Sequence, residues 1–406
     1  MASPMLWCLL AAIACLAAAG RHATAEQEKA VEIVDYRIQL DVIHSGFDRK
    51  TCWVHPRAGA IPGDPPAVVL TMQKLLLSGS DVFYELNEMR TDDLGKTWAG
   101  PTPHATLARR KEGELEVGIC DFTPKWHAAT GKLLGIGQSV HYRNNRLVEH
   151  RHRQTAYSVY NPQARTWAEW RTLEMPDNHK FFNAGAGSVQ RVDLSNGDIL
   201  LPIYFKGDDP KERCYTVTVL RCRFDGTTLH YLEHGTELRS GVPRGFAEPS
   251  LAAHRGRWFL TLRNDRAGHV ARGPDGLRFD PPKEWTFDDG QPLGNYNTQQ
   301  HWVRHPADKG LFLVYTRRGA NNDHVFRHRA PLFIAQVDPE RLCVLRRTER
   351  ILVPEKGARL GNFAVCETSE RETWVTVAEW MQPVGCEKYG SDNRVYVARI
   401  LWDAAR

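Results

Sequence analysis

Residues 91–98 read Thr-Asp-Asp-Leu-Gly-Lys-Thr-Trp, and this short segment carries the strongest local signal for the fold. An aspartate in such a segment accepts backbone N–H hydrogen bonds across a turn, and the glycine takes the positive φ that the turn requires. The tryptophan can then pack beneath the hairpin. The segment therefore predicts a tight turn between two antiparallel strands.

Four weaker versions of this turn follow along the chain. They start at residues 158, 222, 273 and 336, so successive starts lie 67, 64, 51 and 63 residues apart. A period near sixty residues suits one four-stranded propeller blade with a long loop, so the 381 residues after residue 25 correspond to about six blades. We expect an all-β, six-bladed β-propeller of four-stranded antiparallel blades, with seven blades as the alternative. The four segments are SVYNPQARTW (158–167), CRFDGTTL (222–229), GPDGLRF (273–279) and QVDPERLC (336–343).

Ten other segments are rich in β-branched and aromatic residues and are bounded by Gly, Pro, Asn or Asp, which is typical of short strands. The first of them should close the ring by pairing with the last blade. The ten predicted strands are 32–43, 67–77, 132–143, 198–205, 215–224, 257–264, 311–318, 331–337, 372–380 and 394–402.

The first 25 residues differ from the rest of the chain. Residues 5–20 are almost wholly apolar, and Ala23-Thr24-Ala25 follows, which is the pattern of a secretory signal peptide cleaved after Ala25. The absence of Lys or Arg before the apolar run leaves an uncleaved anchor as the alternative. We expect a signal peptide over 1–25, a propeller domain over 26–406, and a secreted or periplasmic protein. No other stretch approaches the roughly 20 apolar residues of a membrane span, so no stable membrane partner is expected.

Composition narrows the function classes. The chain has 406 residues, 42% of them hydrophobic and 25% charged, which excludes a mostly disordered or multi-spanning protein. The 53 Lys and Arg and the 48 Asp and Glu give a net charge of +5, and they are scattered, which argues against nucleic-acid binding. Seven of the nine cysteines follow residue 25 without a CxxC pair, so at least one stays unpaired within the chain, and no metal or cofactor is expected.

The segment 91–98 matches the Asp-box (BNR repeat) of the sialidase, or neuraminidase, superfamily, and the chain resembles that family at further positions. Arg57, in the segment HPRAGAIP (55–62), resembles the arginine that opens the first blade of sialidases. Asp81 follows 24 residues later, at the family's spacing for its acid/base aspartate.

The second half of the chain continues the resemblance. Glu248-Pro249 resembles the family's Glu-Pro pair, and Arg263 follows Glu248 by 15 residues. Arg329, in HRAPLFIAQVD (328–338), resembles the third arginine. The resemblance implies a secreted, exo-α-sialidase-like glycoside hydrolase that acts on an acidic oligosaccharide or glycan.

The same resemblance implies a role for each residue. Three guanidinium groups, those of Arg57, Arg263 and Arg329, would bind the carboxylate of the acidic sugar through charge-assisted hydrogen bonds. Asp81 would be the general acid/base. Glu248 would tune or replace the nucleophile.

One position departs from the family. Sialidases use a tyrosine nucleophile before the last strands, where this chain has Asn362-Phe363, and neither residue can act as a covalent nucleophile. Either a tyrosine from another loop substitutes, or the reaction differs. A non-catalytic, carbohydrate-binding propeller is a further alternative.

A different reaction class would need no tyrosine nucleophile. A polysaccharide lyase or His-dependent glycosidase acting on uronate-containing glycans needs a base, an acid and a cation beside the carboxylate. Candidates for these roles are His127, His141 or His301, together with Tyr315 and Arg317.

Overall fold

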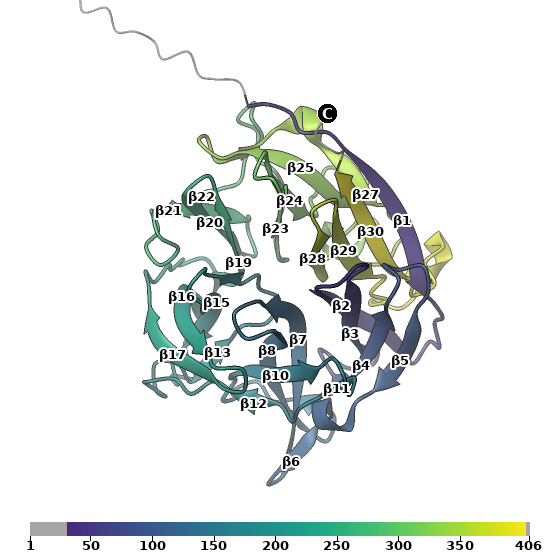
Figure 1. Ribbon diagram of the computed structural model, residues 1–406, viewed down its shortest axis with the longest axis vertical. Helices are drawn as coiled ribbons and strands as arrows, with labels where there is room; N and C mark the ends of the chain where they lie inside the picture. The colour runs from purple at the N-terminus through teal and green to yellow at the C-terminus, as the bar shows by residue number, and fades with distance from the viewer. Residues whose placement is uncertain (1–30, 403–406) are drawn as a thin grey trace, which may run out of the picture. The chain divides into compact units, whose positions relative to one another are not determined.

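The computed structural model describes residues 31–402, and the predicted signal peptide at 1–25 lies outside the described residues. Residues from Ile33 onward form one compact unit. Its strands are grouped in sheets around a central axis, as in a β-propeller (Figure 1). Only short 3-10 turns interrupt the strands, and within 31–402 no helix is long and apolar enough to cross a membrane.

Three sheets have four strands each, in the orders β1-β30-β29-β28, β2-β3-β4-β5 and β19-β20-β21-β22. The strands of these sheets are β1 (Tyr36–His44), β28 (Phe363–Ser369), β29 (Glu372–Ala378), β30 (Val395–Trp402), β2 (Thr51–Ile61), β3 (Ala67–Leu76), β4 (Phe83–Thr91), β5 (Ala99–Pro103), β19 (Ala247–His254), β20 (Arg257–Arg263), β21 (His269–Gly273) and β22 (Lys283–Glu284).

The other three sheets have seven, six and five strands. The seven-stranded sheet contains β6 (Arg110–Glu112), β7 (Leu115–His127), β8 (Lys132–Arg143), β9 (Arg146–Leu147), β10 (Thr155–Asn161), β11 (Thr166–Trp167) and β12 (Arg171–Thr172). The six-stranded sheet contains β13 (Asn183–Gly185), β14 (Val192–Asp193), β15 (Asp198–Lys206), β16 (Cys214–Phe224), β17 (Leu229–His234) and β18 (Arg244–Gly245). The five-stranded sheet contains β23 (His301–Arg304), β24 (Leu311–Tyr315), β25 (Leu332–Asp338), β26 (Cys343–Val344) and β27 (Arg350–Val353). The 3-10 turns are η1 (Ala105–Leu107), η2 (Phe326–His328), η3 (Arg346–Thr348) and η4 (Cys386–Tyr389).

The prediction of six regular four-stranded blades is wrong in its count. Five blades are recognised in the propeller, although strand pairing separates six sheets of unequal size. One physical source of irregularity is the sheet of β13–β18, where the strands that pair with one edge of β15 are the three-residue β13 and the two-residue β14. The spacing of the turns in the sequence does not indicate where hydrogen bonding between neighbouring strands ends.

All ten predicted strands are strands in the structure, with ends shifted by a few residues. The first of them, β1, pairs antiparallel with β30 from Tyr36–Trp402 onward, so the N-terminal strand joins the last sheet as expected.

The predicted turns owe their shape to local hydrogen bonds. Asp93 accepts the backbone N–H of Thr97 at 2.9 Å, and Gly95 has a φ of 81°. Asp225 accepts the N–H of Thr228 at 2.7 Å in the equivalent turn of a later sheet. In both turns the aspartate lies three or four residues before the N–H group that it binds, so the hydrogen bond is local and the sequence alone locates the turn.

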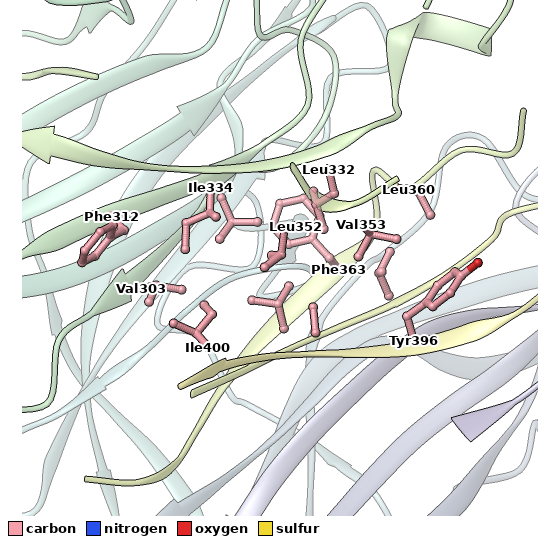
Figure 2. Close-up of a cluster of buried hydrophobic side chains, with 14 of the residues drawn as sticks. Val303, Phe312, Leu332, Ile334, Leu352, Val353, Leu360, Phe363, Tyr396 and Ile400 are labelled. Carbon is pink, nitrogen blue, oxygen red and sulfur yellow. The ribbon is translucent and has the colours of Figure 1, made fainter. Parts of the chain in front are cut away.

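Apolar side chains fill the space between neighbouring sheets. Figure 2 shows one such cluster, where Phe312 and Ile334 of the five-stranded sheet meet Phe363 and Ile400 of the last sheet. These four side chains are fully buried. Burial of each contributes about 1.5–3 kcal/mol, so contacts between sheets hold the ring together.

Candidate active site

Three strands near the axis carry the same irregularity. A β-bulge interrupts the pairing of β2 between Val54 and Arg57, and similar bulges interrupt β7 and β19. Each bulge contains one residue with a positive backbone φ: His55 with 54°, Asp121 with 54° and Glu248 with 45°. Such backbone costs about 1–3 kcal/mol at each residue and is typical of functional sites, because a bulge turns a side chain out of the sheet's alternation.

These bulges line a cavity of about 630 Å³. Seven arginines contribute to its wall, and we call it the arginine cavity. The seven are Arg151, Arg153, Arg244, Arg263, Arg327, Arg329 and Arg359. The carboxylates that line it are Asp81, Asp121 and Glu248, so its wall is strongly positive.

Four of the five residues that the family resemblance singled out line this one cavity. They are Asp81, Glu248, Arg263 and Arg329, which come from four different parts of the chain. The fifth, Arg57, is fully buried and does not line the cavity. The predicted trio of arginines is therefore brought together only in part.

Glu248 and the two cavity arginines form one network. Arg263 donates a short hydrogen bond to the Glu248 carboxylate. Arg263 and Arg329 both donate to the side-chain oxygen of Asn297, at 3.3 and 2.9 Å. Burial, together with the neighbouring charges of Arg263 and Arg359, holds the pKa of Arg329 well below its usual value. Glu248 thus neutralises Arg263, whereas Arg329 has no carboxylate partner among the described residues.

Asp81 is not part of the hydrogen-bonded network of Glu248, Arg263 and Arg329. It is exposed, has a φ of 53°, and its backbone oxygen accepts a 2.9 Å hydrogen bond from the Tyr142 hydroxyl. Burial lowers the pKa of Arg359 and of Arg327, and the negative charge of Asp81 partly opposes this lowering in both, so these two cations lie in its field. No hydrogen bond to the Asp81 carboxylate is formed within 31–402, which leaves it available to a ligand.

Arg57 lies behind the cavity wall. It donates to the Asp121 carboxylate at 3.1 Å and to Ser188 at 2.8 Å. His55 approaches the same carboxylate at 3.4 Å. Burial opposes ionisation of Asp121, but His55 and Arg57 outweigh it and lower its pKa to about 2. Arg57 therefore holds a buried carboxylate in place instead of facing the cavity.

Asn362 also lines the cavity, and its side chain donates to His55 Nε2 at 3.1 Å. Two tyrosines that sequence reasoning missed, Tyr204 and Tyr215, lie elsewhere on the wall. Tyr204 donates to Gln138 at 3.0 Å. Burial raises the pKa of Tyr215, but Arg153, Lys206 and other cations reverse this and hold it below 10. The sequence gives little indication that Tyr204 and Tyr215 belong to a site, because they lie in strands where aromatic residues are ordinarily part of the core.

The histidines proposed for a lyase-type reaction do not line the arginine cavity. His127 contacts the Thr130 hydroxyl and the backbone oxygen of Gly197 at 2.8 and 2.9 Å. His141 is buried on β8, and burial lowers its pKa. His301 is fully buried, and burial holds its pKa well below 6.5.

Tyr315 and Arg317, the other two proposed residues, belong to a separate cluster. The Tyr315 hydroxyl donates to Glu349 at 2.5 Å, and Arg317 donates to both oxygens of that carboxylate at 2.8 and 2.7 Å. Neither lines the arginine cavity. The structure thus scatters the five residues of the alternative set instead of collecting them.

Most of the cavity arginines lack a counter-charge. Among the described residues, Arg244 pairs with Asp265 and Arg263 with Glu248, whereas no ion pair involves the other five. Six buried guanidinium Nε atoms within 31–402 have no hydrogen-bond partner, and five of them belong to this cavity. Buried polar groups are nearly always satisfied, so this concentration marks a site built for an anion.

The described residues form neither a metal-binding cluster nor a disulfide bond. No group of three or more His, Cys, Asp or Glu side chains suited to a metal ion occurs in the described part of the chain. The seven described cysteines, from Cys52 to Cys386, are all free thiols, including Cys214 and Cys222.

Comparisons with known proteins agree with the fold. No family model and no curated protein matches the sequence. A protein of unknown function from Dyadobacter fermentans has 15% identity and a TM-score of 0.62, over 90% of this chain and 99% of that one. Trypanosoma rangeli sialidase, in complex with the inhibitor DANA, has 12% identity and a TM-score of 0.58, over 91% of this chain and 60% of that one. NanB sialidase from Streptococcus pneumoniae has 11% identity and a TM-score of 0.58, over 88% and 70%.

At these identities the likeness concerns the fold alone. The chain spans about 60% of the Trypanosoma rangeli sialidase chain, so a large part of that protein has no counterpart here. This chain is similar to sialidases in its β-propeller architecture.

Proposed function

We propose that this protein is a glycoside hydrolase that releases an acidic sugar from a glycan. The observation that supports it best is the convergence of Asp81, Glu248, Arg263 and Arg329 on one arginine-rich cavity. An enzyme for acidic sugars needs cations for the carboxylate and two acidic groups beside the glycosidic bond.

In this proposal Arg263 and Arg329 bind the sugar carboxylate, and Asp81 donates its proton to the leaving glycosidic oxygen. Glu248, whose carboxylate is bound by Arg263, accepts a proton from a water molecule. The water oxygen forms the new bond to the anomeric carbon as the bond to the leaving oxygen breaks. Asn362 in place of the family's tyrosine favours this direct displacement, in which the anomeric configuration inverts.

A panel of sialylated and uronate-containing glycans tests the proposal. Released sugar should appear with wild type, its first-formed anomer should be inverted by NMR, and Arg263→Ala should abolish release. Binding without any product would instead support a non-catalytic carbohydrate-binding protein.

A second candidate reaction is elimination on a uronate glycan. His55 and Tyr215, neither of them in the predicted lyase set, line the cavity beside its arginines and are suitable base and acid candidates. Elimination would create an unsaturated uronate, so absorbance near its ultraviolet band separates the two reactions. Hydrolysis gives no such absorbance.

We also propose that residues 1–25 direct export and that the enzyme acts outside the cytoplasm or in the periplasm, without a metal or cofactor. N-terminal sequencing of the mature protein should then begin at Glu26. Treatment with EDTA should leave the activity unchanged.

A further inference from the structure

Six of the seven arginines of the cavity fall into two groups, and the seventh, Arg244, forms an ion pair with Asp265. The first group is Arg263, Arg327, Arg329 and Arg359, which line the same cavity, and the charges of the other three all lower the pKa of Arg329 in addition to its burial. This group belongs to the carboxylate site of the proposed function.

The second group is Arg151 and Arg153, on the segment between β9 and β10. After burial, the largest influence on the pKa of Arg151 is the charge of Arg153, which lowers it. Arg153 is only 4% exposed. Its guanidinium carbon lies 4.2 Å from the ring centre of Tyr204 and 5.0 Å from that of Tyr215, both on the neighbouring six-stranded sheet.

The protein leaves this second pair unneutralised. Arg151 donates only to the backbone oxygen of Val148 at 2.7 Å, and Arg153 to that of Tyr204 at 3.3 Å. Both Nε atoms are buried without a hydrogen-bond partner, and no described carboxylate pairs with either residue. Both guanidinium groups belong to the wall of the same cavity and have like charges, so an anion from outside the chain would be attracted to both.

We propose that Arg151 and Arg153 form a second anion subsite, which takes a sulfate ester or a second carboxylate of the same glycan. The inference rests on the proposed function, because it names the class of substrate as a glycan with two anionic groups. A planar carboxylate and a tetrahedral sulfate ester each present a pair of oxygen atoms that a guanidinium group can bind with two hydrogen bonds. The lowered pKa of Tyr215, to which Arg153 and Lys206 contribute, agrees with a positive potential on this wall.

Three disaccharides of one backbone serve as probes: one with a single uronate, one with the uronate and a sulfate ester, and one with two carboxylates. Affinities are measured by calorimetry. We expect wild type to bind at least one of the two dianionic probes about tenfold or more tightly than the single uronate, which corresponds to 1.4 kcal/mol. The difference between the sulfated and the dicarboxylate probe then identifies the second group.

The variant Arg151→Gln/Arg153→Gln should lose this preference and keep the affinity for the single uronate. Arg143→Gln/Arg146→Gln is the matched control, since it removes two exposed charges from the same sheet. Arg151→Gln alone, which gives up one backbone contact, replaces the double variant should that one fail to fold.

Equal binding of all three probes by wild type would overturn the inference, as would a preference that survives in the folded variants. Preferential binding without cleavage of any probe would refute the proposed hydrolysis while supporting the second subsite. Absence of binding to all three would overturn both.

Discussion

Strands near the axis line two cavities, and the arginines of these cavities are held in opposite ways. β2 contributes His55 to the arginine cavity, and its later residues from Ala58 to Ala60 contribute to a second cavity of about 440 Å³. In the second cavity, Arg191 donates to Asp193 at 2.9 Å and to the backbone oxygens of Leu134 and Lys125 at 2.9 and 3.0 Å.

The contrast separates structural from functional charge. Arg191 has each guanidinium nitrogen bonded within the chain, so its charge serves the fold. Arg359, in the arginine cavity, has a single hydrogen bond to Gln382 at 3.3 Å and an unpartnered Nε. Burial and the charge of Arg327 lower its pKa to about 10. A buried cation without a carboxylate partner destabilises the free protein, as expected of a residue that binds an anionic ligand in the proposed function.

The largest expected effect comes from Asp81→Asn. Loss of the proposed general acid should lower kcat/KM by about 10²–10⁴-fold, because proton donation contributes that much. Since the Asp81 carboxylate has no hydrogen bond within the described residues, the melting temperature should not change. Kinetics and calorimetry on the same preparation measure both, and a fully active variant would remove Asp81 from the mechanism.

Arg191→Met tests the structural side of the comparison. It leaves Asp193 and two backbone oxygens without their donor, so we expect unfolding free energy to fall by about 3 kcal/mol. Urea denaturation measures this loss. If stability were unchanged, the distinction between the two cavities would fail.

Arg359→Met should not lower the free energy of unfolding as Arg191→Met does. The guanidinium carbon of Arg359 lies 4.5 Å from the ring centre of Trp380, so the new side chain exchanges a cation–π contact for apolar packing on the same ring and removes a buried charge that has no carboxylate partner. We expect stability to be unchanged or higher by about 1 kcal/mol, with weaker binding of acidic glycans. A destabilised variant with normal affinity would show that Arg359 serves the fold.

The smallest effect concerns pH. His301 is neutral when folded because burial lowers its pKa, so below pH 6.5 the unfolded chain binds protons first and stability falls. His301→Gln should make this loss between pH 6.5 and 5 smaller by about 1 kcal/mol.

His179 provides the control for this experiment. It is exposed, and its hydrogen bond to Asp208 raises its pKa, so its contribution is present below pH 6.5 and lost as pH rises. His179→Gln should therefore alter the pH profile in the opposite direction. Identical profiles for the two variants would contradict the assignment of a neutral, buried His301.

The sequence was more informative for strands in the middle of the sheets than for the edge strands that lie near the axis. The predicted strands such as β8 and β30 have the apolar, β-branched residues that burial between sheets requires. Strands such as β2 and β19 were not among the ten, because bulges and polar residues such as His55 and Glu248 break their alternation. The same irregularity places these residues at the cavity.

The candidate site was likewise predictable in part. Spacing along the chain singled out Asp81, Glu248, Arg263 and Arg329, all of which line the cavity. Spacing could not reveal that Arg57 turns away, because that depends on the bulge and on Asp121 from another sheet.

By itself, the sequence determined the turns and ten of the thirty strands within 31–402, because an aspartate and the N–H groups that it binds lie within four residues, and strand patterns are local. Asp193, the carboxylate that pairs with Arg191, lies two residues away in the sequence, but only the tertiary structure decided which buried arginine has a hydrogen-bond partner for each guanidinium nitrogen. Arg153 and Arg191 are both buried. Arg191 binds a carboxylate and carbonyl groups, whereas Arg153 lies over two aromatic rings. Their partners come from segments up to about 66 residues away, brought close by the packing of neighbouring sheets.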